Sequence, residues 1–479
     1  MKKRILMLSL VAFAALGLTG CGTPAVSSVA ASSATASSAA ASSAVPETAV
    51  QKAVKEAMTL SRDELMKKAA AELGEKGKLK VLAVTSRGGK DAPKNKFKAL
   101  LAAAGSTNTD PVGYDSTVDG KIYTTLCGEI EAGVTDGYSG AILQDGYQLQ
   151  KKFIDTGYQT NYIPKEWKDD ASTIKEGNDD PFTLQYNFKT WMVNNKNKDT
   201  TIDNVWDITA DKYKGKLFTM DPANENVNMD WLIMLTSDKW AADLKTSFEA
   251  ASNDNKGLDL TPYEKYGTAK YSYAFIAKYL ENAVFYGDDG KAVDALASTP
   301  GSIGWIVYSK IQNIKETAEK SKKNIVISAL GEANSDGKTI ANSAMTGFGG
   351  FMYKHYMSIM PNAQYPYATC AFFNVLSTTP EGYTAWAADV GDYPTMQSIN
   401  KDRTVNGHGT LATTAGEDGT FAWTQDATKE NVFPCLNDPS ATWWNDASKG
   451  DAVVETPSYI GTKYNAVKHF IDVCIAAKA

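Results

Sequence analysis

The stretch Leu79–Leu101, LKVLAVTSRGGKDAPKNKFKALL, holds the order of elements that decides the fold. Its first seven residues form an apolar, β-rich run that predicts a strand. The polar, glycine-containing loop Ser86–Gly89 follows, and then Phe97, Leu100 and Leu101 indicate a helix. Strand, glycine loop and helix in this order open an α/β unit. The loop matches neither GxGxxG nor GxxxxGK[ST], so its sequence does not favour a nucleotide site.

The segment before this strand reads as a capped helix. Ser61 and Glu64 fit a capping box, and Leu65, Ala69 and Leu73 fall on one helical face. Beyond residue 101, strands continue to alternate with helical stretches, as a doubly wound α/β sheet requires. Loops after the strands of such sheets converge at one edge, where ligands bind. We therefore expect an α/β fold with a ligand cleft.

Composition narrows the function. The chain has 479 residues, of which 43% are hydrophobic and 22% charged, which is typical of a globular protein of two or three units. Its formal charge of −6 gives no global basic field and disfavours nucleic acid as a partner. The three histidines, His355, His408 and His469, disfavour a multi-histidine metal centre, and we expect no metal or cofactor.

The N-terminus has the pattern of an export signal. Lys2–Arg4 are positive, and residues 5–18 form an apolar run shorter than the about 20 residues of a membrane-spanning helix. The run ends in Leu18–Cys21, LTGC, which resembles a bacterial lipobox. We expect residues 1–20 to be a lipoprotein signal peptide and Cys21 to carry lipid. An ordinary signal peptide with a coincidental cysteine is the alternative.

The next segment, 21–59, is predicted to be a tether and stalk. Residues 27–44, SSVAASSATASSAAASSA, contain almost only Ser and Ala and cannot form a core. No later stretch reaches 18 apolar residues, so no transmembrane helix is expected. The mature protein would be exported and held by lipid at the outer face of the cell membrane, or at the periplasmic face of an envelope membrane.

Four cysteines remain after the lipobox: Cys127, Cys370, Cys435 and Cys474. An even number in an exported protein permits disulfides, in three possible pairings, and four separate buried thiols are the alternative. The spacings are wide and contain no CxxC, which disfavours a zinc site.

Seven segments, in order and spacing, resemble the type 2 periplasmic solute-binding proteins of ABC importers, and most of all the subfamily of ferric, polyamine and thiamine receptors. They are KVLAVTSRGG (80–89), AILQD (141–145), LQYNFKTWMVNN (184–195), VWDITADKYKGKLFTMDPANEN (205–226), PGSIGWIVYSK (300–310), MTGFGGFMYKH (345–355) and GDYPT (391–395). The resemblance covers roughly residues 60–395. It implies a monomeric extracytoplasmic receptor that closes two lobes on a small solute and delivers it to an ABC permease.

This resemblance also implies a domain layout. Lobe 1 would comprise residues 60–188 and the return 344–395, and lobe 2 would comprise 189–343. Residues 396–479 would form a C-terminal extension packed on lobe 1. Two independent domains without hinge motion are the alternative.

Nine residues are candidates for lining the cleft: Ser86, Arg87, Gln144, Asp145, Asp221, Asn224, Trp305, Tyr308 and Phe348. Arg87 could pair with an anionic ligand group or bridge the lobes, or could be a solvated surface residue. Asp145 could accept from a hydroxyl or cation, or could cap the next helix. Trp305 and Tyr308 could stack on a sugar ring or a cation, or could belong to the core.

The same residues suggest the ligand class. Ferric receptors of the resembled subfamily ligate iron through two adjacent tyrosines, whereas this chain has Tyr308 followed by Ser309. Acidic residues crowd the predicted helix start at Asp221, Glu225 and Asp230, which opposes an anion. We expect a neutral hydroxylated, sugar-like solute or a cationic organic one. A ferric or other ion receptor is the alternative, and an extracellular hydrolase using paired carboxylates is the second.

The anchor can be tested directly. Cys21→Ala should abolish lipid labelling and either release the protein from membranes or leave the precursor unprocessed, because the thiol is the acceptor of the lipid. Metabolic labelling with a fatty acid and membrane fractionation measure both effects. A wild-type protein that carries no lipid and washes off membranes with salt would contradict the assignment.

Overall fold

The computed structural model describes residues 46–194, 202, 204–251, 257–310, 327–329, 346–387, 392–400, 409–415, 421–425 and 451–478. The chain divides into two compact units, Met1–Pro46 and Glu47–Ala479, and the fold below is that of the second unit. The predicted signal peptide, the lipid-bearing Cys21, the Ser/Ala tether 27–44 and Cys435 lie outside the described residues.

The second unit is built on a mixed sheet with the strand order β2-β1-β3-β9-β4-β7-β5-β6. Strands pair in parallel on one side of this order, β2-β1-β3, and on the other, β7-β5-β6. The central pairs β3-β9, β9-β4 and β4-β7 are antiparallel. The strand bounds are β1 (Leu79–Ala83), β2 (Val112–Ser116), β3 (Gly140–Leu143), β4 (Thr183–Asn194), β5 (Leu217–Met220), β6 (Ala283–Tyr286), β7 (Ile303–Val307) and β9 (Phe348–Ile359).

Five further strands are present among the described residues. Strands β8 (Ile327–Ala329) and β10 (Asp392–Pro394) pair with β4, and β13 (Asp451–Val454) pairs with β9. The remaining two, β11 (Gly409–Ala415) and β12 (Phe421–Gln425), form a separate antiparallel pair.

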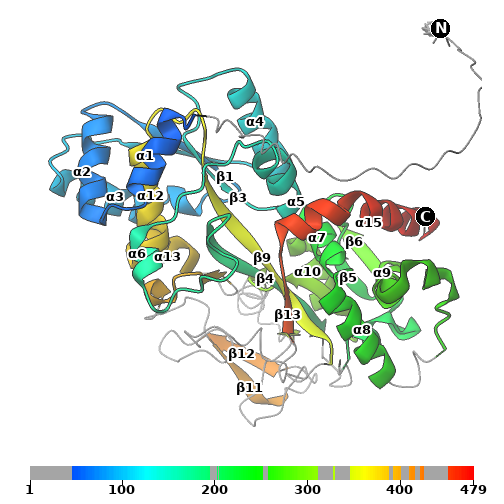
Figure 1. Cartoon of the computed structure of the whole chain (residues 1–479). Coiled ribbons are helices and arrows are strands. Elements are labelled where there is room, and N and C mark those ends of the chain that lie inside the picture. The colour runs from blue at the N-terminus through cyan, green and yellow to red at the C-terminus, as the bar shows by residue number, and fades with distance from the viewer. Residues whose placement is uncertain are drawn as a thin grey trace, which may run out of the picture. The chain divides into compact units, whose positions relative to one another are not determined.

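Strands β4 and β9 join the two parallel halves. Each has twelve residues, all of them buried, and at about 3.3 Å per residue each extends for roughly 40 Å. Figure 1 shows them crossing the centre between two groups of helices. We call the half with β1, β2 and β3 lobe 1, and the half with β5, β6 and β7 lobe 2. The predicted lobe boundary at residue 189 falls inside β4, because this strand runs unbroken through both lobes.

Helices cover the sheet in both lobes (Figure 1). In lobe 1 they are α1 (Ala49–Ala57), α2 (Arg62–Leu73), α3 (Asp91–Ala103), α4 (Asp119–Glu131), α6 (Lys165–Asp169), α12 (Pro366–Thr378) and α13 (Pro380–Ala387), with the short α5 (Gly146–Gln148) running into η2 (Leu149–Ile154). In lobe 2 they are α7 (Asn226–Met234), α8 (Asp238–Ala250), α9 (Lys270–Asn282) and α10 (Asp289–Ser298), and the chain ends in α15 (Pro457–Lys478). No described helix is long and apolar enough to cross a membrane.

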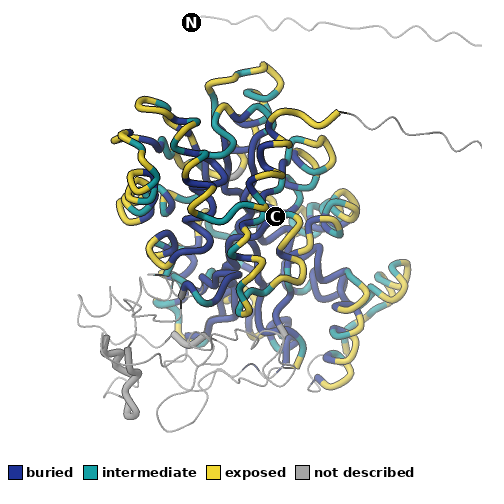
Figure 2. Tube along the Cα trace, turned by 60° about the vertical axis from the view of Figure 1, so that its left-hand side comes forward, coloured by how far each residue is buried: buried dark blue, intermediate teal, exposed yellow. Residues whose placement is uncertain are grey.

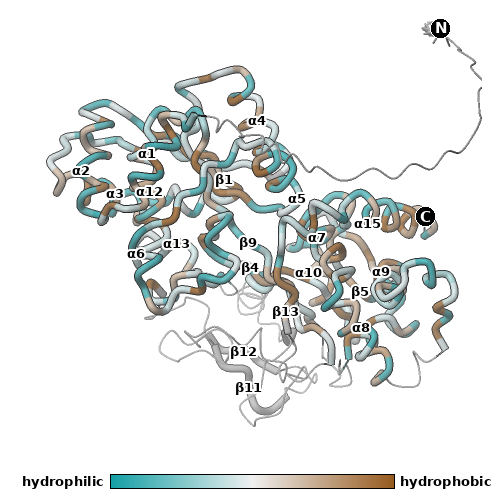
Figure 3. The backbone as a smooth tube through the Cα atoms, viewed as in Figure 1, coloured by the Kyte–Doolittle hydropathy of each residue, from teal (hydrophilic) through white to brown (hydrophobic). Residues whose placement is uncertain are grey.

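Apolar side chains fill the space between the helices and the sheet. Figure 2 shows the buried residues concentrated in the interior, and Figure 3 shows hydrophobic residues along strands such as β1 and β5. One cluster in lobe 1 joins α2, α3 and α12 to β1, and another in lobe 2 is rich in tryptophan. Burial of this apolar surface is the main force that holds each lobe together.

The N-terminal helix predictions are confirmed for α2 and corrected for α1. Ser61 and Glu64 form the predicted capping box of α2. Residues 49–57, predicted as part of a stalk, instead form α1, whose Val50, Val54 and Ala57 are buried in the lobe 1 cluster. The apolar residues at spacings of three and four explain this packing.

The C-terminal segment does not pack on lobe 1 alone. Helix α15 contacts α5 and η2 of lobe 1, and also α7 and α9 of lobe 2. Phe470 lies against Tyr266 and Tyr273 of lobe 2, whereas Tyr464 stacks on Tyr147 of lobe 1 with ring centroids 3.4 Å apart. The C-terminal segment therefore ties the two lobes to each other.

The described cysteines are separate thiols. Cys127, Cys370 and Cys474 are free, and Cys370 is buried in lobe 1. Of the two alternatives that the sequence left open, the structure favours unpaired thiols at these three positions.

A glycine in β9 fixes how closely the two central strands approach. A Cβ atom at Gly350 would lie 2.1 Å from Phe188 Cε2 and 2.5 Å from the Lys189 carbonyl oxygen of β4. Gly350→Ala should therefore lower the free energy of unfolding by about 1–3 kcal/mol, measured by urea denaturation. Gly128→Ala in α4, where a Cβ meets nothing within 4 Å, is the control and should be neutral or slightly stabilising. Equal stability of the two variants would contradict the expectation.

Candidate ligand site between the lobes

Polar side chains occupy one face of the two central strands. Gln185, Asn187 and Lys189 alternate along β4, and Tyr353 and His355 alternate along β9. The register pairs Gln185 with His355 and Asn187 with Tyr353, so these side chains share one face. All five residues are buried. Because buried polar groups must find partners, this face is a place where hydrogen bonding is concentrated.

At the lobe 1 end of this face, amide and imidazole side chains form a hydrogen-bonded chain. Gln185 Nε2 donates to Asn187 Oδ1 at 2.6 Å and lies 3.1 Å from His355 Nδ1. The Nδ1 atom is therefore the acceptor, and the ring proton stands on Nε2, 3.1 Å from Gln144 Oε1. Burial, together with the charge of Arg87, lowers the pKa of His355 to about 3. The ring is neutral at ordinary pH and acts as a hydrogen-bonding group.

Arg87 lies beside this hydrogen-bonded chain and forms an ion pair within the protein. Its Nη1 is 2.5 Å from Asp392 Oδ2, and the Arg87 side chain is 24% exposed against 2% for Asp392. Asp392 belongs to β10, which pairs with β4. The predicted anion-pairing role of Arg87 is thus met by a carboxylate within the protein.

The lobe 2 end of the face is charged and paired. Lys189 Nζ lies 3.3 Å from Glu225 Oε2, 3.6 Å from Asp289 Oδ2 and 2.9 Å from Asn228 Oδ1. Glu225 caps the N-terminus of α7 by accepting from the Asn228 amide, and Asp289 lies in the first turn of α10. Burial raises the pKa of Glu225, and the charge of Lys189 opposes that rise. Two helix starts therefore bring two carboxylates to one buried lysine.

Tyr353 stands between the two ends. Burial raises its pKa well above the ordinary value, and the nearby charges of Asp289, Asp392 and Glu225 add to that rise. Its phenol therefore stays protonated and can donate a hydrogen bond.

The structure brings only some of the sequence-predicted residues to this face. Gln144 and Arg87 lie there, whereas Ser86 is exposed at the start of the 3-10 turn η1 (Arg87–Gly89). Asp221 accepts from Asn224 Nδ2 at 2.8 Å, so these two close their own loop. Asp145 is buried and caps α5 by accepting from the Gln148 amide, which is the capping role that the sequence offered as an alternative.

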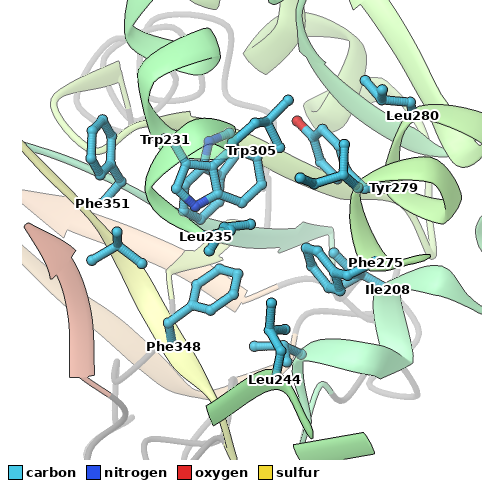
Figure 4. Close-up of a cluster of buried hydrophobic side chains, with 14 of the residues drawn as sticks. Ile208, Trp231, Leu235, Leu244, Phe275, Tyr279, Leu280, Trp305, Phe348 and Phe351 are labelled. Carbon is cyan, nitrogen blue, oxygen red and sulfur yellow. The ribbon is translucent and has the colours of Figure 1, made fainter. Parts of the chain in front are cut away.

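The structure corrects the prediction that aromatic side chains line the cleft. Trp305 has no exposed surface and stacks on Trp231 with ring centroids 4.1 Å apart, and Phe348 packs into the same cluster (Figure 4). Tyr308 is buried in another cluster, against Phe188. A ligand would have to displace core packing to stack on these rings. These aromatic residues therefore belong to the core, which was the alternative interpretation of Trp305 and Tyr308. Strand β7 contributes core packing where a cleft wall was expected.

Sequence reasoning missed Gln185, Asn187, Lys189, Tyr353 and His355, although a signal exists. In LQYNFKTW (184–191) the polar residues Gln185, Asn187 and Lys189 recur at every second position, and in FMYKHY (351–356) Tyr353 and His355 are likewise two residues apart. In a strand with one solvent face such alternation is ordinary, but here both segments lie in the middle of the sheet. Polar residues of period two in central strands indicate a functional face.

No protein-family model and no curated protein sequence matches the chain. Among solved structures, iron-bound HitA from Pseudomonas aeruginosa matches with a TM-score of 0.51 and 11% identity, over 83% of this chain and 99% of HitA. The chain has the two-lobed fold of type 2 periplasmic binding proteins. Two further matches score lower. The apo ferric ion-binding protein A of Pasteurella haemolytica matches at TM-score 0.48 and 12% identity, over 83% and 97% of the two chains. An ABC transporter protein of Clostridium perfringens matches at 0.48 and 11%, over 83% and 100%.

The buried lysine of this periplasmic-binding-protein fold supports a stability prediction. Lys189→Met would leave Glu225 and Asp289 buried without their cation, which should cost about 3–5 kcal/mol of unfolding free energy. The loss should shrink as pH falls from 8 towards 5, because the raised pKa of Glu225 rises further and the carboxyl then folds in its protonated form.

Urea denaturation at both pH values measures this. Lys214→Met is the control, because the Lys214 side chain is 61% exposed and pairs with the half-buried Glu281. Loss of an ion pair near the surface changes stability by at most about 1 kcal/mol. A Lys189→Met protein as stable as the control would contradict the analysis.

Proposed function

We propose that this protein is an extracytoplasmic solute-binding receptor that holds a small solute at the polar face of β4 and β9 and delivers it to an ABC permease. The observation that carries the proposal is the row of buried hydrogen-bonding side chains on the two strands that run through both lobes. A solute at this face would contact both lobes, so its binding free energy would favour lobe closure. HitA, whose fold this chain shares, is iron-bound, which supports a binding protein over the hydrolase alternative.

The proposed ligand is a neutral hydroxylated molecule, with a cationic organic molecule second. The charges around the face are already matched, Arg87 by Asp392 and Lys189 by Glu225 and Asp289. An ionic ligand would have to compete with these pairs. A hydroxyl-bearing solute could instead use the uncharged donors and acceptors of the face, which are Gln144, Gln185, Asn187, Tyr353 and the neutral His355. Such a ligand exchanges one hydrogen bond for another at little net cost.

A ferric or other ion is the alternative ligand. HitA, whose fold this chain shares, is an iron-bound protein, which supports this alternative. The excess of carboxylates near the face, Glu225, Asp289 and Asp392 against Arg87 and Lys189, also suits a cation. The export signal and lipid at Cys21 belong to the same proposal, since a receptor working as a monomer beside a membrane permease gains from an anchor and a tether.

The ligand class can be tested by thermal shift with the purified mature protein. The panel contains sugars, polyamines, thiamine, ferric complexes and inorganic anions. A ligand at 100 to 1,000 times its Kd should stabilise the protein by about 2.7–4.1 kcal/mol. We expect sugars or other polyols to raise the melting temperature. Small-angle scattering should then show a smaller radius of gyration when the protein is saturated with that ligand. A shift with ferric iron alone would establish the alternative, and turnover of a glycan would establish the hydrolase.

The position of the site is tested by a variant. Gln144→Ala should weaken the identified ligand about tenfold or more, because it removes a polar group at the end of the hydrogen-bonded chain. Asn95→Ala, an exposed amide on α3 of the same lobe, is the control and should bind as the wild type does. Unchanged affinity in Gln144→Ala, measured by calorimetry, would place the ligand elsewhere.

A further inference from the structure

Three buried carboxylates meet where the two lobes and the C-terminal segment come together. Asp145 belongs to lobe 1, Asp230 to α7 of lobe 2, and Glu455 follows β13. Each residue has no exposed surface. They lie outside the polar face described above and none of them is used by it.

Two of the three carboxylates have a full set of donors. Asp145 Oδ1 accepts from the Gln148 amide at 3.0 Å, and its Oδ2 accepts from Asn226 Nδ2 of lobe 2 at 2.5 Å. Glu455 Oε1 accepts from the Gly146 amide at 3.1 Å. Its Oε2 accepts from the Tyr356 hydroxyl at 2.7 Å and from the Lys354 amide at 2.9 Å. These contacts suit ionised carboxylates, which accept only.

Asp230 differs from both. Its two oxygens are buried and neither makes a hydrogen bond of good geometry. Burial raises its pKa well above the ordinary value, and the negative charges of Asp145 and Glu455 raise it further, although the amides of Gly146 and Tyr147 oppose the rise. Asp230 lies one helical turn after Asn226, on the same side of α7. Lobe 2 thus presents one amide and one carboxyl to the start of α5.

Other titratable groups surround the three. Burial raises the pKa of Glu455, and the charge of Lys354 opposes that rise. Burial also lowers the pKa of Lys354 to about 8, and its Nζ donates to the Gly177 carbonyl. Tyr356 and Tyr464 are held protonated by burial and by the neighbouring carboxylates. When the lobes are together, ionisation of Asp230 would place a further negative charge beside Asp145 and Glu455.

We infer that Asp145, Asp230 and Glu455 form a proton-operated latch between the lobes, in which the closed arrangement holds one proton on Asp230 and the open arrangement releases it to solvent. The inference extends the proposed function, because parting of the lobes would release a bound solute. No covalent bond changes, and only a proton passes between Asp230 and water.

The direction of the pH effect follows from linkage. When the lobes part, Asp230 is exposed to water and regains an ordinary pKa of about 3.9, whereas in the closed form its pKa is raised. The closed form therefore binds more protons. Lowering the pH favours closure, and raising it above the ordinary aspartate pKa disfavours closure progressively until the raised pKa is passed.

Asp230→Asn tests the latch with the ligand-free mature protein, because the amide keeps the shape and removes the ionisation. Small-angle scattering of the wild type should show a larger radius at pH 8.5 than at pH 5, and the variant should keep the small radius at both. Its Tm should exceed that of the wild type by roughly 2–4 °C at pH 8.5 and by less at pH 5, because pH 5 lies closer to the ordinary aspartate pKa. Asp294→Asn, an exposed aspartate on α10 of the same lobe, should follow the wild type throughout.

An Asp230→Asn protein with the pH profile of the wild type would overturn the latch. Should the variant fail to fold, the wild type alone decides, because a radius that is the same at pH 5 and pH 8.5 overturns it equally. No ligand enters either measurement. Failure of the latch is therefore distinct from failure of the solute screen, which concerns the polar face.

Discussion

The antiparallel pairing of β4 with β9 is the constraint on which the rest of the structure depends. These strands are the link between the parallel strands of lobe 1 and those of lobe 2, and their register sets which residues of the two strands share a face. A slip of one residue would move Gln185, Asn187 and Lys189 to the opposite face and expose Phe188 to the polar groups of β9. Close contact at Gly350 and the Lys189–Glu225 pair both oppose such a slip. Fold and site are therefore specified by the same pairing.

Placing polar groups on central strands has an energetic cost that the neighbouring elements offset. A buried lysine is costly unless it is paired, and the starts of α7 and α10 provide Glu225 and Asp289. A buried imidazole avoids the cost by staying neutral, as His355 does between Gln185 and Gln144. The result is a face whose groups are held in fixed positions before any ligand arrives. At the proposed ligand face, preorganisation of this kind would reduce the entropy lost on binding.

Sequence reasoning could predict the architecture because local patterns and the order of segments both carry it. The capping box at Ser61, the strand at 79–83 and the crossing segment 184–195 all appear in the structure as β- or α-elements near their predicted bounds. The candidate site was predicted less well, because the periodicity of a buried strand does not show which of its two faces forms a polar site. Trp305 and Phe348 follow the same pattern as cleft residues would, and only the position of α7, with Trp231 on it, shows that they belong to a core.

The C-terminal segment shows the same limit from the other direction. Nothing in its sequence predicts that β13 joins the sheet beside β9 or that α15 contacts both lobes, because these contacts join residues far apart in the chain. Yet the contacts have a consequence for motion. Two lobes joined by two strands alone have a hinge with little to oppose it, whereas here Tyr464 on Tyr147 and Phe470 on Tyr273 hold one helix to both lobes. Opening must break one of these contacts or bend α15. The free energy of opening is thus set at this segment as well as at the central strands, and Glu455 brings a titratable group to the same place.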